Sequence, residues 1–298
     1  MDRFDAMRVF TRIVERRSFT HAADDLGLPR SSVTDAVKGL EARLGVRLLQ
    51  RTTRQVSPTL DGEAYYQRCV NLIADLEEAE GAFAGAKPSG LIRVDVHGTQ
   101  ARHFLLPGLP DFLAEYPGIR LHIAEAHQPL DMIREGFDCI LRTGELADSQ
   151  LVQRRLASLE RGTFANPGYL GRFGSPATPD QLEGHWMVGL MEQQIGEIAP
   201  LVFRDGDTVR RFTLPALITV TGPETNVASA CIGLGLIQVP RYRVEAELAS
   251  GVLVEVLPDF PPSPLPVHIL YAQPRQLSPR LRVFIDWVVE RYRGPAGR

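Results

Sequence analysis

Apolar residues recur at helical spacing in three stretches near the N-terminus. They are Met7, Phe10, Ile13 and Val14 in the first stretch, Ala22, Ala23 and Leu26 in the second, and Val33, Val37, Leu40 and Leu44 in the third. Steps of three and four residues place most of each set on one face of a helix. Ser18 suits an N-cap, Gly27 a left-handed C-terminal residue and Pro29 the first turn of a new helix. The pattern predicts three packed helices, the last two joined by a tight turn.

The third predicted helix presents a polar face formed by Arg30, Ser31, Ser32, Thr34, Asp35 and Lys38. A helix-turn-helix offers its second helix to the DNA major groove, where short hydroxyls reach base edges without holding the helix away. Arg30 and Lys38 can reach guanine edges or phosphates. Asp35 can accept a hydrogen bond from cytosine N4, but it repels phosphate. These residues are candidate DNA-binding residues, and an ordinary solvated face on a small helical domain is the alternative.

A basic hairpin is predicted directly after the third helix. The stretch VRLLQRTTRQVSPT contains two short strands, with Leu48, Leu49 and Val56 pointing inward. Its tip carries the further DNA-binding candidates Arg51, Thr53 and Arg54. Such a wing would lie along phosphates or a minor groove. Residues 1–58 are therefore expected to form a winged helix-turn-helix domain.

A long helix is predicted over residues 59–87, with Thr59 as its N-cap. Its apolar positions alternate in steps of four and three residues and are Tyr65, Cys69, Leu72, Leu76, Ala79 and Phe83. This spacing is that of a coiled-coil seam and predicts a linker helix that pairs with a second copy of the chain. A helix packed on its own domain is the alternative. The residues AGAKPSG, 84–90, mark a hinge after the helix.

Strand and helix patterns alternate from residue 88 to residue 298, which predicts an α/β domain with a mostly parallel sheet. One hairpin is expected to turn at Asp205 and Gly206. Ligands of such sheets bind beyond the strand ends, where helix N-termini present free N–H groups. The candidate ligand-binding residues at these places are Thr99, Gln100, His127, Gln128, Arg142, Thr143, Thr221 and Asn226. The alternative for each of them is a helix cap without a ligand.

Charge and composition change this picture in two respects. Residues 1–60 carry 11 Lys and Arg against 7 Asp and Glu, whereas the rest of the chain carries 22 against 29. A basic head on an acidic body fits a polyanion-binding module attached to another domain. The chain has no apolar stretch of signal-peptide or membrane-span length, and its three cysteines are far apart and odd in number. These features indicate a cytoplasmic protein without a membrane partner or a disulfide framework.

Catalytic and metal-binding motifs are absent from the sequence. No Walker A loop, HExxH, G-x-S-x-G or CxxC pattern occurs, and the seven histidines form no ligand-spaced cluster. We therefore expect no enzyme activity, no cofactor and no metal. A cytoplasmic solute-binding protein and an enzyme remain as less favoured alternatives.

The first 62 residues resemble the LysR-type transcriptional regulators. The resemblance lies in MRVFTRIVERRSFTHAADDLGLPRSSVTDAVKGLEARLGVRLLQRTTRQVSPTLDG, and it continues more loosely to the end of the chain. One position departs from the family pattern: residue 35 is often basic there and is Asp35 here. The departure puts a family-wide consensus operator in doubt.

The resemblance implies the function, the partners and the organisation of the C-terminal part. It implies a DNA-binding transcriptional regulator that reads a pseudo-palindromic operator in double-stranded DNA, pairs through the linker helix and assembles dimers into a tetramer. It implies a periplasmic-binding-protein-like effector domain of two Rossmann-like lobes, lobe I at about 90–161 and 267–293 and lobe II at about 162–266. A small-molecule inducer, often a carboxylate, is expected between the lobes. The alternative within the family is a thiol redox sensor that uses Cys139 or Cys231, although both lie in apolar runs typical of inert packing.

Overall fold

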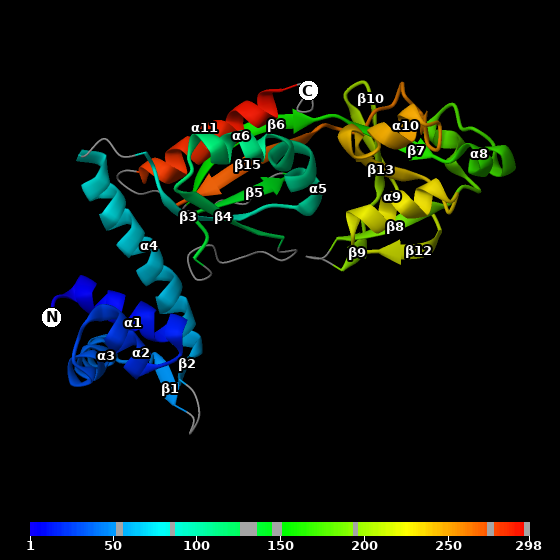
Figure 1. Cartoon of the computed structure of the whole chain (residues 1–298). Coiled ribbons are helices and arrows are strands. Elements are labelled where there is room, and N and C mark those ends of the chain that lie inside the picture. Colours follow the sequence, from blue (N-terminus) through cyan, green and yellow to red (C-terminus); the bar gives the residue numbers. More distant parts are fainter. Residues whose placement is uncertain are drawn as a thin grey trace.

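The computed structural model describes residues 1–51, 56–83, 87–125, 136–144, 151–192, 196–272 and 277–294. A small N-terminal unit is joined by one long helix to a C-terminal body of two lobes (Figure 1). The overall α/β class, the winged helix-turn-helix and the two-lobed domain predicted from the sequence are confirmed. Within the described residues, no helix is both long enough and apolar enough to span a membrane.

The three predicted N-terminal helices are present as α1 (Arg3–Arg16), α2 (Phe19–Leu26) and α3 (Arg30–Leu44). Ser18 caps α2, because its hydroxyl accepts a hydrogen bond from the backbone N–H of His21 at 3.2 Å. Gly27 takes the left-handed conformation expected of it, with φ 63°. The apolar faces of the helices pack into one core.

Leu44 does not belong to that core, contrary to the pattern that assigned it there. Its exposed fraction is 39%, whereas Val33, Val37 and Leu40 are buried. Leu44 lies in the last turn of α3, and Gly45 then ends the helix with φ 72°. The chain turns toward the wing at this point, so the fourth position of the apolar stripe has no partner helix.

The wing consists of the antiparallel strands β1 (Leu49–Arg51) and β2 (Val56–Pro58). Glu41 of α3 holds its first strand, since Oε1 accepts hydrogen bonds from the backbone N–H groups of Leu48 and Leu49 at 2.8 and 3.2 Å. This contact fixes the direction of the wing relative to α3.

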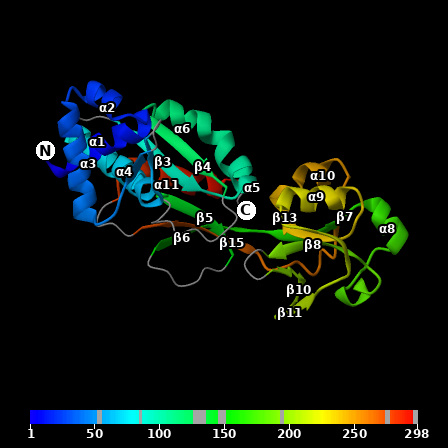
Figure 2. The same ribbon diagram turned by 90° about the horizontal axis from the view of Figure 1, so that it is seen from below.

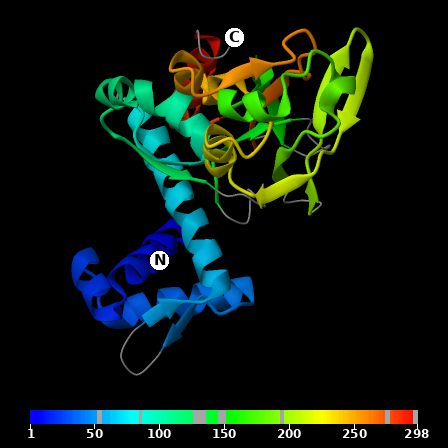
Figure 3. The same ribbon diagram turned by 90° about the vertical axis from the view of Figure 1, so that its right-hand side faces the viewer.

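The linker helix α4 (Leu60–Phe83) begins at the predicted cap. The Thr59 hydroxyl accepts a hydrogen bond from the Gly62 N–H at 2.9 Å and donates one to the Arg47 carbonyl at 2.6 Å. Gly62 lies so close to the wing that a Cβ on it would be 1.9 Å from the Leu48 carbonyl oxygen. Only glycine fits there. From this start α4 rises toward the C-terminal body (Figure 3).

Lobe I contains a five-stranded sheet in the described part of the chain, in the order β4-β3-β5-β15-β6. The strands are β3 (Gly90–Asp95), β4 (Ile119–Ala124), β5 (Cys139–Thr143), β6 (Val152–Leu159) and β15 (Leu265–Tyr271). The helical segments are α5 (Gly98–Gln100), η1 (Ala101–Leu105), η2 (Leu106–Gly108), α6 (Leu109–Glu115) and α11 (Pro279–Arg293). Phe112 of α6 contacts Phe284 and Trp287 of α11 in the lobe I core.

The sheet of lobe I is mostly parallel, as expected, since β4, β3, β5 and β6 run in one direction, and β15 is the exception among the described strands. Strand β3 runs parallel to β4 and β5, but β15 is antiparallel to both β5 and β6. The reason is the chain path: β6 leaves for the second lobe and β15 returns from it. Local strand patterns carry no information about this return.

Lobe II holds the sheets β13-β7-β14 and β12-β8-β9 and the hairpin β10-β11, which turns after Asp205 as predicted. Its strands are β7 (Arg161–Ala165), β8 (Met187–Glu192), β9 (Glu197–Ile198), β10 (Leu201–Asp205), β11 (Thr208–Phe212), β12 (Ala216–Val220), β13 (Ile237–Pro240) and β14 (Val254–Val256). Its helices are α8 (Pro167–Phe173), η3 (Pro179–Leu182), α9 (Pro223–Cys231), η4 (Arg241–Arg243) and α10 (Glu245–Ala249). The chain passes between the lobes twice, from β6 to β7 and from β14 to β15 (Figure 2).

Candidate nucleic-acid interface and effector cleft

The exposed side of α3 is the candidate DNA-reading surface. Successive residues of a helix are about 100° apart, so Ser31, Asp35 and Lys38 lie together, opposite the core residue Leu40. All three are exposed. This face therefore offers a hydroxyl, a carboxylate and an ammonium group to a groove.

The other three candidates on α3 flank this centre on different sides. Arg30 and Thr34 lie on one flank, where the Thr34 hydroxyl donates to the Arg30 carbonyl at 2.9 Å. Ser32 lies on the opposite flank, half-buried, and lines a groove with Asp2 and Arg3 at the start of α1. The six candidates thus do not form one stripe. Their sequence spacing could have revealed this, because positions 32 and 34 are about 200° apart on a helix.

The candidate side chains of the wing tip lie outside the described part of the structure. Arg51 ends β1, and its side chain lies outside the described part of the structure. Thr53 and Arg54 also fall outside the described residues.

The predicted seam of α4 divides into two parts. Cys69 is fully buried within the N-terminal core, and the ring of Tyr65 contacts that of Phe10 with centroids 5.6 Å apart. Burial raises the pKa of the Cys69 thiol to about 11 and that of Tyr65 to about 12. The assignment of Cys69 to a face open to a second copy is therefore wrong, because the start of α4 packs on its own domain.

Farther along α4 the same face is open. Leu72 and Leu76 are large apolar side chains with exposed fractions of 45% and 38%. Ala79 and Phe83 continue the spacing, but their side chains lie outside what the structure describes. The face available to a partner begins about one turn after Cys69.

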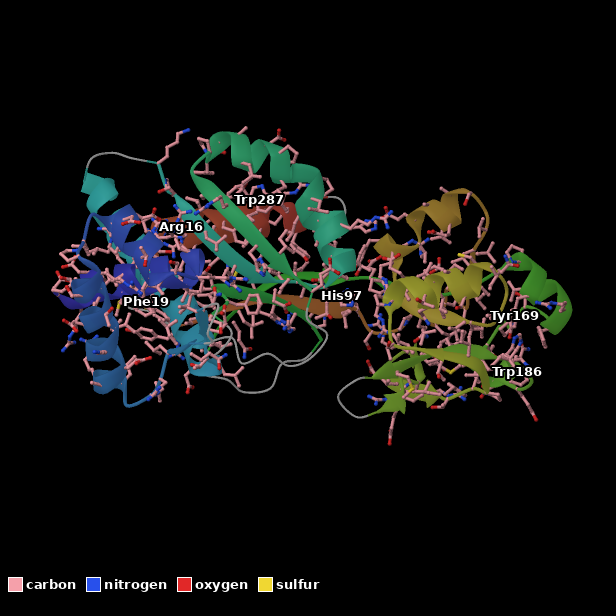
Figure 4. All side chains as sticks on the ribbon, turned by 60° about the horizontal axis from the view of Figure 1, so that its bottom comes forward. Arg16, Phe19, His97, Tyr169, Trp186 and Trp287 are labelled. Carbon is pink, nitrogen blue, oxygen red and sulfur yellow. The ribbon has the colours of Figure 1, made fainter. Side chains whose placement is uncertain are left out.

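A cavity of about 260 Å³ lies between the two lobes. Lobe I contributes Thr99, Arg102 and His103 to its lining, and lobe II contributes Glu224, Tyr242 and Arg243. The cavity lies at the end of lobe I that faces lobe II, near His97 (Figure 4). It is a polar cavity of mixed charge, because Glu245 and Glu247 also line it.

Thr99 links the two lobes across this cavity. Its hydroxyl oxygen is 3.1 Å from the Tyr242 hydroxyl and 3.1 Å from His97 Nδ1. Tyr242 is buried, its ring makes edge contacts with His103 and Phe104, and burial raises the pKa of its hydroxyl. A ligand that bonds to Thr99 would therefore act on the contact between the lobes.

Arg243 brings buried hydrogen-bond donors to the cavity. Its Nε and Nη2 atoms are buried and have no hydrogen-bond acceptor among the described residues. Burial lowers the pKa of this guanidinium; Tyr242 and Glu224 raise it, and the nearby Arg161 lowers it further. Burial also lowers the pKa of Arg161. A buried donor without an acceptor is unfavourable, and an anionic ligand would satisfy it.

The remaining ligand-binding candidates bond within their own lobes or lie elsewhere. Gln100 accepts a hydrogen bond from the Tyr292 hydroxyl at 3.3 Å, and Asn226 donates to the Val188 carbonyl at 3.4 Å. Arg142 forms an ion pair with the buried Asp95 at 2.5 Å. Thr143 and Thr221 are exposed and do not line the cavity, and His127 and Gln128 fall outside the described ranges.

The cavity residues absent from the sequence-based set had weak local signals. Arg102 and His103 follow Thr99 by three and four residues, which is one helical turn. Tyr242 and Arg243 lie in η4, which begins directly after the buried strand β13. Both are places where a polar side chain can face the end of a sheet.

The two cysteines of the redox alternative differ in burial. Cys139 is fully buried, and burial raises the pKa of its thiol well above the usual value. Burial also raises the pKa of the half-buried Cys231. Groups of three or more His, Cys, Asp or Glu side chains that could hold a metal ion do not occur among the described residues.

A winged helix-turn-helix joined by a long helix to a two-lobed domain with a polar cleft defines a transcriptional regulator that responds to a small molecule. Comparison with known proteins identifies the family. The model of the LysR substrate binding domain matches residues 85–293, and that of the bacterial regulatory helix-turn-helix protein, lysR family, matches residues 4–63. The chain belongs to the LysR family of transcriptional regulators, with a helix-turn-helix DNA-binding domain and an effector-binding domain.

Similar proteins match almost the whole chain. An uncharacterized HTH-type transcriptional regulator of Escherichia coli strain K12, YhjC, is 38% identical over 292 residues that cover 97% of each chain. An HTH-type transcriptional repressor of Pseudomonas aeruginosa strain UCBPP-PA14 is 37% identical, covering 97% of this chain and 92% of its own. The solved structure of CrgA, a LysR-type transcriptional regulator from Neisseria meningitidis, is 31% identical with a TM-score of 0.61, covering 96% and 97% of the two chains.

Proposed function

We propose that this regulator is a cytoplasmic protein that reads a pseudo-palindromic operator as a dimer and responds to a small organic anion in its interlobe cavity. The helices of the N-terminal unit supply the DNA-reading surface. The open part of α4 supplies the pairing face, and the cavity supplies the sensor.

The buried guanidinium of Arg243 carries the proposal of an anionic effector. Its Nε and Nη2 atoms lack an acceptor among the described residues, although carboxylates line the same cavity. A carboxylate or phosphate can accept two parallel hydrogen bonds from one guanidinium. Thr99 and Tyr242 lie on the same cavity and can orient the rest of the ligand. A cavity of about 260 Å³ suits a small metabolite.

For DNA binding we propose that Ser31, Asp35 and Lys38 form the centre of the contact. Arg30, Ser32, Thr34 and the wing residues Arg51, Thr53 and Arg54 are proposed at its margins. The exposure of the three central side chains on one side of α3 supports this division. Asp35 among them favours a cytosine at one position of the half-site.

For assembly we propose pairing of two α4 helices through Leu72, Leu76, Ala79 and Phe83. Exposed leucines at heptad spacing support this, since an apolar stripe on a long helix is stabilised by a second copy. Two winged helices are then held at a fixed separation, which selects half-sites at a fixed spacing. The proposal includes a tetramer that consists of two such dimers.

Signalling requires that the effector distinguish two arrangements of the protein, because a ligand with equal affinity for both changes nothing. The Thr99–Tyr242 contact joins the lobes directly. A ligand that replaces or reinforces this contact changes the orientation of the two lobes relative to each other. Strand β3 transmits that change to α4.

The experiment is a promoter–reporter assay on the DNA that flanks the gene of this protein. Benzoate, succinate and inorganic phosphate serve as probes of a ring carboxylate, a dicarboxylate and a bare anion. We expect one class to change expression and Arg243→Gln to remove that response. Arg155→Gln changes an exposed arginine on β6 and is the matched control. An unchanged response in Arg243→Gln would place the effector elsewhere.

A further inference from the structure

A second groove lies between the DNA-binding unit and lobe I, far from the interlobe cavity. It measures about 250 Å³ and is formed by α1, α2 and α4 on one side and by β3 and β4 on the other. Its lining residues lie within positions 8–15, 70–74 and 90–91 and at positions 26 and 120. We call it the junction groove.

An ion pair lies beside the junction groove, next to its lining residues Ala74 and Gly90. Arg280 of α11 has an exposed fraction of 1%, and its Nη1 is 2.6 Å from Asp75 Oδ1 on α4. Its Nε donates to the Leu91 carbonyl of β3 at 3.3 Å. Next to it, a Cβ on Gly90 would be 3.3 Å from Arg280 Cδ. The linker helix is thereby tied to lobe I beside the groove, so the two walls face each other.

Both walls of the junction groove carry apolar side chains and arginines. The apolar side chains of its lining are Leu26, Val70, Ile73, Ala74 and Leu91, all half-buried. Arginines lie on both walls: Arg8 and Arg12 on α1 and Arg120 on β4. Glu15 is the acidic residue of the lining, and it pairs with Arg12 at 3.1 Å.

Arg8 and Arg120 are left without a carboxylate. Neither forms an ion pair among the described residues, and they line one groove from different elements, α1 and β4. Like charges on two docked surfaces oppose the docking, and an anion between them removes this repulsion. A mixed lining of apolar side chains and guanidinium groups favours a ligand that has an apolar body and an anionic head.

We propose that the junction groove is a second effector site, which binds a small amphipathic carboxylate. The ligand contacts Arg8 of the DNA-binding unit and Arg120 of the effector domain together. It therefore binds the arrangement in which the two units are docked and stabilises that arrangement over any other. This gives the regulator an input that acts on its DNA-binding unit without passing through the interlobe cavity.

The test is isothermal titration calorimetry of the full chain with octanoate, and with octanol as the uncharged probe of the same length. We expect one saturable octanoate site per chain and binding of octanol at least tenfold weaker. Arg8→Gln and Arg120→Gln should each weaken octanoate binding about tenfold, since each removes a charged hydrogen bond. Ile73→Trp should fill the groove and abolish binding.

Two control variants separate this site from the interlobe cavity. Arg243→Gln and Arg155→Gln should both bind octanoate as the unchanged protein does. The proposal is overturned if the unchanged protein shows no saturable binding, if octanol binds as tightly as octanoate, or if Arg120→Gln binds normally. Loss of binding in Arg243→Gln alone would place octanoate between the lobes, which would overturn the junction site and leave the interlobe proposal intact.

Discussion

At the scale of single residues, the hydroxyl of Thr99 has a definite partner, the hydroxyl of Tyr242 in the other lobe. We expect Thr99→Val to keep the fold and the operator affinity but to respond only at a higher effector concentration. The loss should be on the order of 1–3 kcal/mol if the hydroxyl bonds to a charged oxygen. Tyr242→Phe removes the other half of the same contact. Effector titration of the reporter compares the two variants, and a normal response in both would exclude this contact from sensing.

Gly62 tests how closely the linker helix approaches the wing. Because a Cβ there would meet the Leu48 carbonyl, Gly62→Ala should destabilise the N-terminal unit by about 1–3 kcal/mol. Gly39→Ala is the matched control: Gly39 is also helical, and a Cβ on it would meet nothing within 4 Å. That change should stabilise α3 by about 0.5–1 kcal/mol. Urea unfolding followed by circular dichroism measures both, and equal effects would contradict the packing.

At the scale of elements, α3 separates DNA-reading positions from flanking ones. Lys38→Gln should weaken binding to all duplexes and flatten the salt dependence by about one unit of log–log slope, because one phosphate contact is lost. Ser32→Ala should change the affinity little, since Ser32 faces the groove beside α1. Salt titrations of duplex binding measure both slopes. Equal slopes for Lys38→Gln and the unchanged protein would remove Lys38 from the interface.

The first turns of the linker helix α4 are buried, and its later turns have an exposed apolar face. Substitution by aspartate should therefore have different effects in the two parts. Leu72→Asp and Leu76→Asp should dissociate the dimer without unfolding the chain, because each places a charge in an apolar pairing face. Cys69→Asp should instead unfold the N-terminal unit, since it buries a charge in the core. Light scattering and circular dichroism distinguish these results. Unchanged oligomers in both leucine variants would refute pairing through α4.

The element scale also shows how far the sequence could predict this fold. Helical spacing and capping residues predicted α1, α2 and α3, and Thr59 predicted the start of α4. The heptad spacing correctly predicted an apolar stripe along α4. Spacing alone, however, does not say which part of the stripe packs on its own domain. The same limit explains Leu44, whose position depends on where the neighbouring helices end.

At the scale of the whole molecule, the interlobe cavity joins residues that are far apart in sequence. Thr99 and Arg102 come from one segment, and Glu224, Tyr242 and Arg243 come from segments more than 100 residues later. Thr99 could be predicted because it follows a strand and begins a helix. Arg243 could not, because its role arises from the burial of its guanidinium and from the return of the chain between the lobes.

The Asp75–Arg280 ion pair belongs to this scale as well, because it ties the linker helix to the effector domain. Asp75→Asn removes from α4 the charged hydrogen-bonding partner of the buried Arg280 guanidinium and should be destabilising. Asp111→Asn, an exposed change at the start of α6, is the control. Hydrogen exchange at β3 and α4 should rise only in Asp75→Asn. Equal exchange in both variants would show that the pair does not hold the two units together.

The central claim is that this protein reads DNA as a paired winged helix, and a footprint on duplexes selected from a random pool by the full chain tests it most directly. We predict protection of two half-sites related by a pseudo-twofold axis and separated by a whole number of helical turns. Leu72→Asp should lose the paired footprint, and Ser31→Ala should relax the preference at one base pair in each half-site. Protection of a single site without symmetry, unchanged in both variants, would contradict the account.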